Sequence, residues 1–278
     1  MADVLHVLDH PAAGAAAPKL AVRDLVVARR YASGEDVLVT DRISFEVGTG
    51  EFVCLLGPSG CGKTSILHVL AGLDGPAEGE ALLDGRPVEG PGPDRAVLFQ
   101  EPALFPWLSV RGNVELAMEL IGVPPAERAE RAARWLANVH LERVADAQPH
   151  ELSAGMRQRA ALARAMAADP DVLLGDEPFG ALDAQARELL QDEVQQAWVA
   201  SEGRRTFLFV THNVREAVLL ADRVLVMSAA PGRLLHEYRI HAARPRDLDD
   251  VLVSRVVSEI HGLLRREVDR GVEHEMGR

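Results

Sequence analysis

The chain has 278 residues, of which 47% are hydrophobic and 26% are charged, a composition that suits a soluble globular protein with a sizeable buried core. Its formal net charge of −12 argues against nucleic acid as the main partner, because phosphate backbones select basic surfaces. No uncharged apolar stretch reaches the roughly 18 residues that suggest a membrane span, and the N-terminus does not read as a secretory signal. We therefore expect a cytosolic chain, which can still dock on a membrane protein.

The first third of the chain alternates between strand-like patterns and turns. Residues 1–18 are rich in alanine and proline and show no sustained period, so we expect a disordered tail. Strand-like patterns follow at 20–30 and 43–56, and the second ends in a glycine-rich loop followed by the helical apolar pattern KTSILHVLAGL. The segment GEALLDGRPV, with Asp84-Gly85 at its centre, predicts a β-hairpin.

The middle of the chain changes from strand-like to helical patterns. Residues from about 102 to 168 are dominated by Ala, Glu, Arg and Leu at helical spacing. Strand-like segments return at DVLLGD, RTFLFVTH and DRVLVMS, with helical runs between them, and this alternation predicts a parallel sheet with crossover helices. We expect a main domain over 19–245 with a helical lobe inserted at about 102–168, and an amphipathic helical tail over 246–278.

The loop GPSGCGKTS matches the phosphate-loop pattern G-x-x-x-x-G-K-[ST], and it stands between a predicted strand and a predicted helix, as that motif requires. In such a loop the backbone N–H groups surround the phosphates, Lys63 reaches the β- and γ-phosphates, and the Thr64 hydroxyl binds Mg²⁺. The alternative is a chance glycine-rich turn, which the flanking strand and helix disfavour. The nucleotide-binding residues expected here are Gly57, Pro58, Ser59, Gly60, Cys61, Gly62, Lys63, Thr64 and Ser65.

Two further strand ends carry polar residues that suit phosphate chemistry. DVLLGDE is an apolar strand pattern that ends in Asp176 and Glu177. In phosphate-loop proteins an acid at such a strand end holds Mg²⁺, which we expect of Asp176, and Glu177 is placed to orient the attacking water. The pattern FVTH ends in His212, a donor for the γ-phosphate. The alternative interpretation is that Asp176 and Glu177 are merely solvated acids at a strand end and that His212 has only a structural role.

The segment HELSAGMRQRAALARA places three small residues, Ser153, Ala154 and Gly155, at the predicted start of a long helix. A helix N-terminus favours an anion, and small side chains let a ligand reach the backbone N–H groups there. The alternative is a simple N-cap at Ser153, which accounts for the serine and leaves the glycine without a reason.

Taken in order, these motifs resemble the nucleotide-binding subunit of ABC transporters over residues 20–246. The family's elements occur in its own sequence order: Tyr31, the phosphate loop, Gln100 in VLFQEP, then LSAGMRQR, LLGDEP, GALD and VTH. The resemblance implies an α/β fold with a phosphate-loop NTPase core, an antiparallel β layer and an inserted helical lobe. It also implies ATP and Mg²⁺ as ligands, with Gln100 as a further contact of Mg²⁺ and of the attacking water. Glu177, His212 and Gln100 are the catalytic residues that it implies.

The resemblance further implies a homodimer in which two subunits pair head to tail around two ATP molecules. The signature of one subunit would cover the ATP of the other, through Ser153, Ala154, Gly155 and Met156. Ala154 departs from the family, which has glycine at that position. Asp183 in GALD would cross the dimer interface.

The adenine of ATP would stack on Tyr31, with Arg30 and Gly34 nearby. A tyrosine packed into the core is the alternative interpretation of Tyr31.

Three segments narrow the resemblance to the nitrate, sulfonate and taurine importers: QPHELSAGM, LFPWLSVRGNVELAMEL and VMSAAPGRLLHEYRI. That group implies an ATP-hydrolysing subunit on the cytoplasmic face of the membrane, peripheral to it. Its partners would be membrane permease subunits, contacted near Gln100 and Trp107, and a separate solute-binding protein. The alternatives are an importer subunit for a vitamin or pyrimidine precursor and a soluble ABC ATPase outside transport. The segments PHELSAGM and APGRL count against an exporter, and the absence of N-K-x-D counts against a GTPase.

Overall fold

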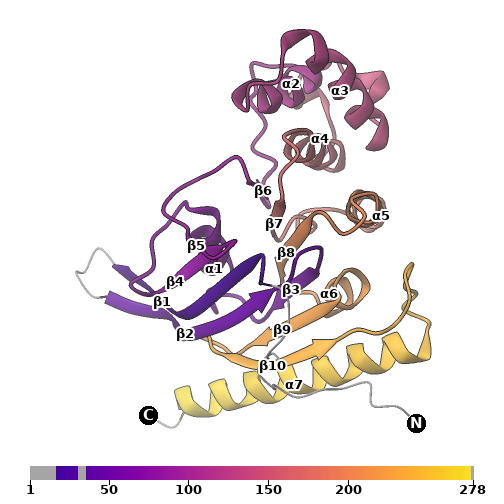
Figure 1. Ribbon diagram of the computed structural model, residues 1–278. Coiled ribbons are helices and arrows are strands. Elements are labelled where there is room, and N and C mark those ends of the chain that lie inside the picture. Colours follow the sequence, from indigo (N-terminus) through magenta and orange to yellow (C-terminus); the bar gives the residue numbers. More distant parts are fainter. Residues whose placement is uncertain (1–16, 31–35, 277–278) are drawn as a thin grey trace. The chain divides into compact units, whose positions relative to one another are not determined.

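The structure of the chain is a computed structural model that describes residues 17–30 and 36–276 (Figure 1). The described residues form two compact units. Unit 1 is drawn from 1–91 and 208–278, and unit 2 consists of 92–207. Within the described ranges, none of the helices combines the length and the apolar character needed to cross a membrane.

Unit 1 contains an antiparallel four-stranded sheet in the order β2-β1-β4-β5. Its strands are β1 (Leu20–Arg30), β2 (Asp36–Val47), β4 (Glu78–Leu83) and β5 (Arg86–Pro87). The turn between β4 and β5 has positive φ at both Asp84 (49°) and Gly85 (72°), as a tight hairpin turn requires, so the predicted hairpin is confirmed. β2 begins seven residues earlier than its local pattern indicates (43 − 36 = 7), because pairing with β1 extends it.

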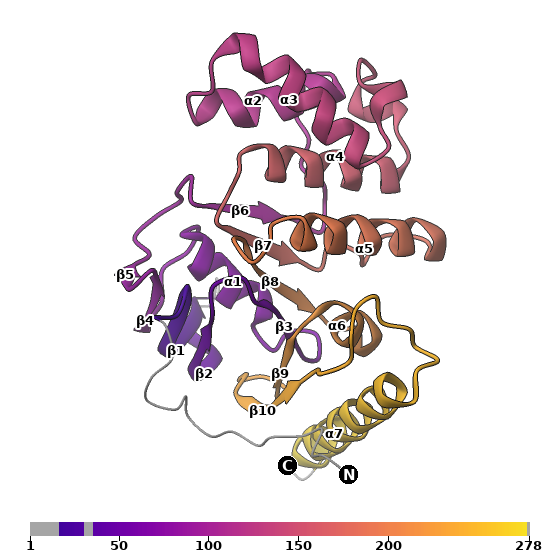
Figure 2. The ribbon, with the colours of Figure 1, turned by 45° about the vertical axis from the view of Figure 1, so that its right-hand side comes forward.

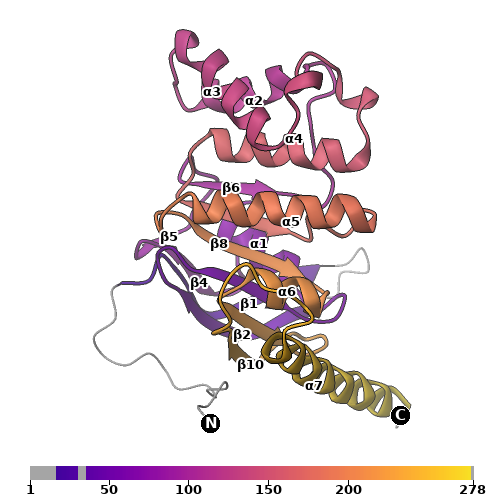
Figure 3. The same ribbon diagram turned by 90° about the vertical axis from the view of Figure 1, so that its right-hand side faces the viewer.

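Unit 1 also holds the strands that carry the phosphate loop. These are β3 (Phe52–Leu56), most of β8 (Thr206–Thr211), β9 (Arg223–Met227) and β10 (Leu234–Arg239), in the order β10-β9-β3-β8. β3 and β9 run parallel, and the Phe52 and Phe209 rings meet edge to face with centroids 5.0 Å apart. Among the described residues of this unit the helices are α1 (Lys63–Ala71), α6 (Val214–Leu220) and α7 (Val251–Met276). α6 packs on both β3 and α7 (Figure 3).

Unit 2 is mainly helical. It contains α2 (Val110–Leu120), α3 (Pro125–Asn138), α4 (Ala154–Ala167) and α5 (Ala184–Val199), with short 3-10 turns at Glu142–Val144 and Pro149–Glu151. α2, α3 and α4 pack against one another, and α4 also packs against α5 (Figure 2). Two parallel strands complete the unit, β6 (Arg95–Leu98) and β7 (Val172–Asp176). β6 is absent from the sequence prediction, because four residues of weak pattern become a strand only through pairing with β7.

The fold confirms the predicted class, a phosphate-loop α/β core with an antiparallel layer and added helices. α2, α3 and α4 fall within the span of 102–168 given to the helical lobe, whereas unit 2 runs over 92–207. The predicted domain boundaries, including the tail at 246–278, therefore stay predictions.

Candidate nucleotide-binding and catalytic site

The phosphate loop connects β3 directly to α1. β3 ends at Leu56, and α1 begins at Lys63 after Gly62, whose φ of 96° lies in the left-handed region. Lys63 is only 4% exposed, and its Nζ donates to the carbonyl oxygens of Gly57 and Pro58, both at 2.9 Å. The ammonium group is therefore held against the loop's own carbonyls, at the start of a helix that favours anions.

Two residues outside the motif brace this loop. A Cβ added at Gly62 would lie 2.4 Å from Thr40 Cγ2, and one added at Gly232 would lie 2.0 Å from the carbonyl oxygen of Cys61. Thr40 and Gly232 also form a β-bridge with each other. The sequence analysis missed both residues. Gly232 lies in the APGR segment that it used only as a mark of subfamily.

Cys61 packs inside the loop. Burial raises the pKa of its thiol above the usual value, although the nearby Lys63 ammonium opposes this shift. The thiol is therefore protonated at neutral pH, and it fills space in the loop as a small apolar group.

His212 follows β8, and hydrogen bonds fix the backbone on both sides of it. The Thr211 hydroxyl donates to Glu216 Oε2 at 2.8 Å. On the other side, Asn213 caps α6 by accepting from the N–H of Arg215 at 3.0 Å. The imidazole is exposed, so this arrangement presents His212 to solvent at the end of a buried strand. The supporting roles of Asn213 and Glu216 were missed by the sequence analysis, which stopped at the VTH motif.

In unit 2 the two predicted acids lie at the C-terminal end of β7. Asp176 is its last residue and is 8% exposed, while Glu177 follows with a φ of 43°. Positive φ is uncommon for a residue with a side chain, it costs about 1 kcal/mol or more, and such residues gather at functional sites. The turn is closed by the N–H of Gly180, which donates to the Glu177 carbonyl at 3.0 Å.

The side chains of Gln100 and Glu177 both end near Gly180. A Cβ added at Gly180 would lie 3.5 Å from Gln100 Nε2 and 3.9 Å from Glu177 Oε2. The ends of both side chains therefore border Gly180, which has no side chain to separate them. Two of the three residues predicted to be catalytic thus border the same glycine within unit 2.

α4 anchors the segment that carries Gln100. The buried Gln158 donates through Nε2 to the Phe99 carbonyl at 2.8 Å. Arg164 donates through Nη1 to the Ala103 carbonyl at 2.7 Å and through Nη2 to that of Pro102 at 3.1 Å. Because the signature starts this same helix, α4 joins the signature to the segment on either side of Gln100. The sequence analysis did not assign a role to Gln158 or Arg164.

The signature lies at the N-terminus of α4. Ser153 is the N-cap, and its Oγ accepts from the N–H of Met156 at 3.2 Å. Ser153 and Ala154 are exposed and Gly155 is buried. A Cβ added at Gly155 would lie 2.8 Å from Ala186 Cβ, so close packing of α4 on α5 explains the glycine. In the sequence analysis, access of a ligand to the backbone was the only explanation given for this glycine.

Asp183 has a structural role at the start of α5. It is the N-cap of that helix, and its Oδ1 accepts from the N–H of Ala186 at 2.8 Å. Since Ala186 also contacts Gly155, the N-terminal ends of α4 and α5 lie side by side. Two helix N-termini, each favourable to an anion, are thus presented together.

The remaining predicted residues divide between the units and the undescribed segments. Unit 1 holds the phosphate loop and His212, and unit 2 holds Gln100, both acids, the signature and Asp183. Tyr31 and Gly34 lie outside the described residues, and Arg30 is the last, exposed residue of β1. The predicted Mg²⁺ ligands, Thr64, Gln100 and Asp176, offer a hydroxyl, an amide and a carboxylate oxygen, a donor set that suits Mg²⁺.

Comparison with known proteins identifies the family. The model of a family described as ABC transporter matches residues 40–180. An uncharacterized ABC transporter ATP-binding protein, MJ0412 of Methanocaldococcus jannaschii, is 46% identical over 90% of this chain and 92% of its own length. The taurine import ATP-binding protein TauB of Mesorhizobium japonicum is 51% identical over 74% of this chain and 79% of its own.

A solved structure supports the same assignment. The ATP-binding cassette MJ0796, solved as a dimer bound to ADP and Pi, superimposes with a TM-score of 0.70 at 28% identity, covering 81% of this chain and all of that one. Fold and site together define an ATPase of the phosphate-loop class. The chain belongs to the ABC transporter family, and it is an ATP-binding subunit that couples ATP hydrolysis to transport.

Proposed function

We propose that this chain powers an importer of a small solute, and that the solute is an anion of the nitrate, sulfonate and taurine class. The observation that carries the proposal is the identity of 45–51% to three proteins named as taurine import ATP-binding proteins. The segments QPHELSAGM and APGRL, which resemble the same importers, support it. Import of a vitamin or pyrimidine precursor is the competing assignment.

In the proposed reaction, water attacks the γ-phosphate of ATP in line with the leaving ADP. Glu177 accepts a hydrogen bond from this water and orients it, with Gln100 beside it at Gly180. His212 donates to a γ-phosphate oxygen, and Lys63 leaves the loop carbonyls to pair with the β- and γ-phosphates. Mg²⁺, held by Thr64, Asp176 and Gln100, would neutralise charge that develops on the phosphate oxygens.

The proposed active form is a head-to-tail homodimer on the cytoplasmic face of the membrane. The exposed Ser153 and the N-terminus of α4 would contact the γ-phosphate bound by the other subunit, and Asp183 would lie at the interface. The dimeric state of MJ0796 supports this arrangement. Permease subunits would dock near Gln100 and the aromatic pair Phe105 and Trp107, of which Trp107 is 72% exposed. A separate solute-binding protein would deliver the solute.

The variant Glu177→Gln tests the catalytic assignment. It keeps the shape of the side chain and removes the charge that orients water, so we expect ATP binding and a trapped dimer with turnover reduced at least a hundredfold. Steady-state phosphate release and size-exclusion chromatography with Mg-ATP are the measurements. Glu202→Gln is a matched control, because Glu202 is an exposed glutamate that also has positive φ (52°). Normal turnover in Glu177→Gln would show that another group orients the water.

The transport assignment needs a separate test. The tagged chain is isolated from detergent-solubilised native membranes, and its companions are identified by mass spectrometry. A polytopic permease in comparable amount supports the importer, and the companion solute-binding protein is then titrated with taurine, nitrate and a pyrimidine precursor. Cytosolic companions alone would contradict the transport role of this chain.

A further inference from the structure

The C-terminal end of β1 lies beside the phosphate loop of unit 1. The N–H of Val27 donates to the Thr40 hydroxyl at 2.9 Å, and the Cγ2 of Thr40 would lie 2.4 Å from a Cβ added at Gly62. Beyond this point β1 stays paired with β2, with Arg29 opposite Val37. The backbone at Arg29 is therefore held next to the loop by contacts of both strands.

The side chain of Arg29 reaches the first turn of α1. Its Nη2 donates to Ser65 Oγ at 3.3 Å; Ser65 is 4% exposed, whereas Arg29 is exposed. Ser65 is the third residue of α1 and follows Thr64 of the phosphate-loop motif. The first N–H groups of a helix lack partners within the helix and attract anions, so the guanidinium adds positive charge where a phosphate is already favoured. A hydrogen bond of 3.3 Å is long, and the guanidinium can turn from it to a stronger acceptor.

Arg29 has no acidic partner among the residues that the structure describes, although the chain has a net charge of −12. Two other arginines of the same sheet do have one: Arg23 pairs with Glu80, and Arg42 pairs with Glu78. A guanidinium presents its N–H donors in a fork that matches the oxygens of a phosphate. A phosphate beside α1 would therefore use donors of Arg29 that no acid occupies.

The phosphate that Arg29 would contact follows from the roles of the neighbouring residues. In loops of this motif the lysine, here Lys63, reaches the β- and γ-phosphates, and the hydroxyl residue, here Thr64, holds a Mg²⁺ ion that bridges β- and γ-oxygens. The α-phosphate is bound by backbone N–H groups and receives no cationic side chain from the motif. We propose that Arg29 supplies that cation, by donating to a non-bridging oxygen of the α-phosphate next to Ser65.

This contact deepens ATP binding and rests on the placement of the phosphates proposed above, but not on the identity of the solute. The α-phosphate is present in both ATP and ADP, and its charge does not change while the γ-phosphate is attacked. Arg29 therefore stabilises substrate, transition state and product alike, and such uniform binding lowers KM without raising kcat.

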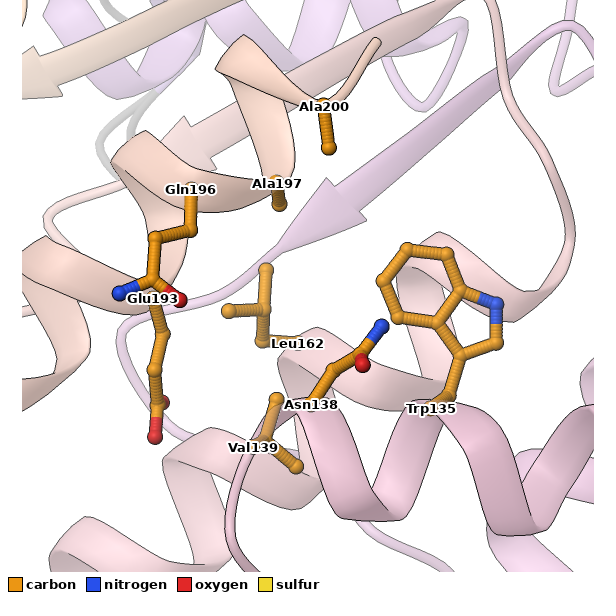
Figure 4. A pocket seen from close by; sticks show the side chains of 8 residues that line it. All are labelled: Trp135, Asn138, Val139, Leu162, Glu193, Gln196, Ala197 and Ala200. Carbon is orange, nitrogen blue, oxygen red and sulfur yellow. The ribbon is translucent and has the colours of Figure 1, made fainter.

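The cavity in unit 2 offers no comparable contact to a phosphate. It has a volume of about 190 Å³, and it is lined chiefly by Trp135, Asn138, Leu162, Glu193 and Gln196, as Figure 4 shows. None of its lining residues is a lysine, arginine or histidine. A phosphate group placed there would find no cation, so nucleotide titrations of the full chain report on the phosphate loop.

Calorimetric titration of the full chain with ADP and with ATP tests the proposal. Both are titrated with EDTA in place of Mg²⁺, so that no ATP is hydrolysed. Arg29→Gln should raise the Kd of ADP and of ATP by the same factor, about tenfold, the effect of losing one hydrogen bond to a charged group. In steady-state hydrolysis with Mg²⁺, KM should rise while kcat stays within about twofold. Arg23→Gln, at an exposed arginine of the same strand, is the matched control and should change none of these values.

The two diastereomers of ADP that carry sulfur on the α-phosphate locate the contact. They place sulfur at one or the other non-bridging oxygen, so their Kd ratio reports on a donor to one of these oxygens. This ratio should change at least about threefold in Arg29→Gln and stay constant in Arg23→Gln. Arg29→Gln should also keep its tenfold effect in a Ser65→Ala background, because the contact to the phosphate is direct.

The proposal is overturned if Arg29→Gln binds ADP as tightly as wild type, weakens ATP alone, or leaves the diastereomer ratio unchanged. Loss of its effect in the Ser65→Ala background would overturn it too, by showing that Arg29 acts only through that hydroxyl. Lys63→Ala separates this outcome from failure of the phosphate-loop assignment. If ADP binding is lost in Lys63→Ala but kept in Arg29→Gln, only the role of Arg29 is wrong, whereas undiminished binding in both variants contradicts the assignment of the loop itself.

Discussion

The contact between Gly155 and Ala186 shows how one missing side chain sets the spacing of two helices. The space between α4 and α5 has no room for a methyl group at Gly155, since an added Cβ would approach Ala186 Cβ to 2.8 Å. Gly155 was noticed in the sequence because it follows a serine at a helix start. Its packing partner lies 31 residues further along the chain (186 − 155 = 31), and no local pattern indicates that distance.

Gly155→Ala should therefore lower the free energy of unfolding by about 1 to 3 kcal/mol, the usual cost of overpacking, despite the better helix propensity of alanine. The double variant Gly155→Ala with Ala186→Gly exchanges the methyl group between the helices, and it should recover most of the loss. Urea denaturation of wild type, both single variants and the double variant measures the coupling. Additive effects in this cycle would contradict the packing explanation.

At the scale of elements, one arginine ties the end of α6 to the segment that follows β10. Arg246 is nearly buried, and its guanidinium donates to the carbonyls of Val218 at 2.8 Å and Ile240 at 3.0 Å, and also to that of Ala221. Its Nε donates to the Ala242 carbonyl at 3.0 Å. The last carbonyls of a helix have no donor within the helix, and Arg246 supplies donors from outside it to carbonyls at the end of α6.

Arg246→Gln should lower the free energy of unfolding by about 2 to 4 kcal/mol, because it leaves several buried carbonyls without donors. The control is Arg239→Gln, at an exposed arginine whose guanidinium pairs with Glu237, for which we expect a loss under about 1 kcal/mol. Chemical denaturation followed by circular dichroism provides both numbers. Equal losses in the two variants would show that Arg246 acts only as a surface charge.

At the scale of the whole molecule, local motifs and long-range packing were predictable to different degrees. The phosphate loop, the strand ending in Asp176 and the Asp84-Gly85 hairpin are local patterns, and the structure places each on its expected element. β6 and the first half of β2 form because a partner strand supplies their hydrogen bonds. The tie from Gln158 to Phe99 likewise joins distant segments, and only the tertiary structure shows it.

Nucleotide binding should be visible in the stability of the entire chain. A ligand at a hundred times its Kd adds about 2.7 kcal/mol to the free energy of unfolding, so saturating Mg-ATP should raise the midpoint of thermal unfolding clearly. Lys63→Ala should abolish this increment, because it removes the ammonium group held against the phosphate loop. Lys19→Ala changes the only other lysine, which pairs with Asp84, and should keep the increment. A full ATP increment in Lys63→Ala would contradict the role of that lysine.

The backbone conformation at Glu177 lowers thermal stability, whereas its carboxylate is needed for the proposed turnover of ATP. A φ of 43° is adopted more readily by asparagine than by glutamate. A library of variants sorted for thermal endurance alone would therefore enrich Glu177→Asn, which relaxes the turn and discards the carboxylate proposed to orient water. Sorting the same library for ATP consumption would restore glutamate. A stabilised form of this protein should accordingly be engineered with position 177 held fixed.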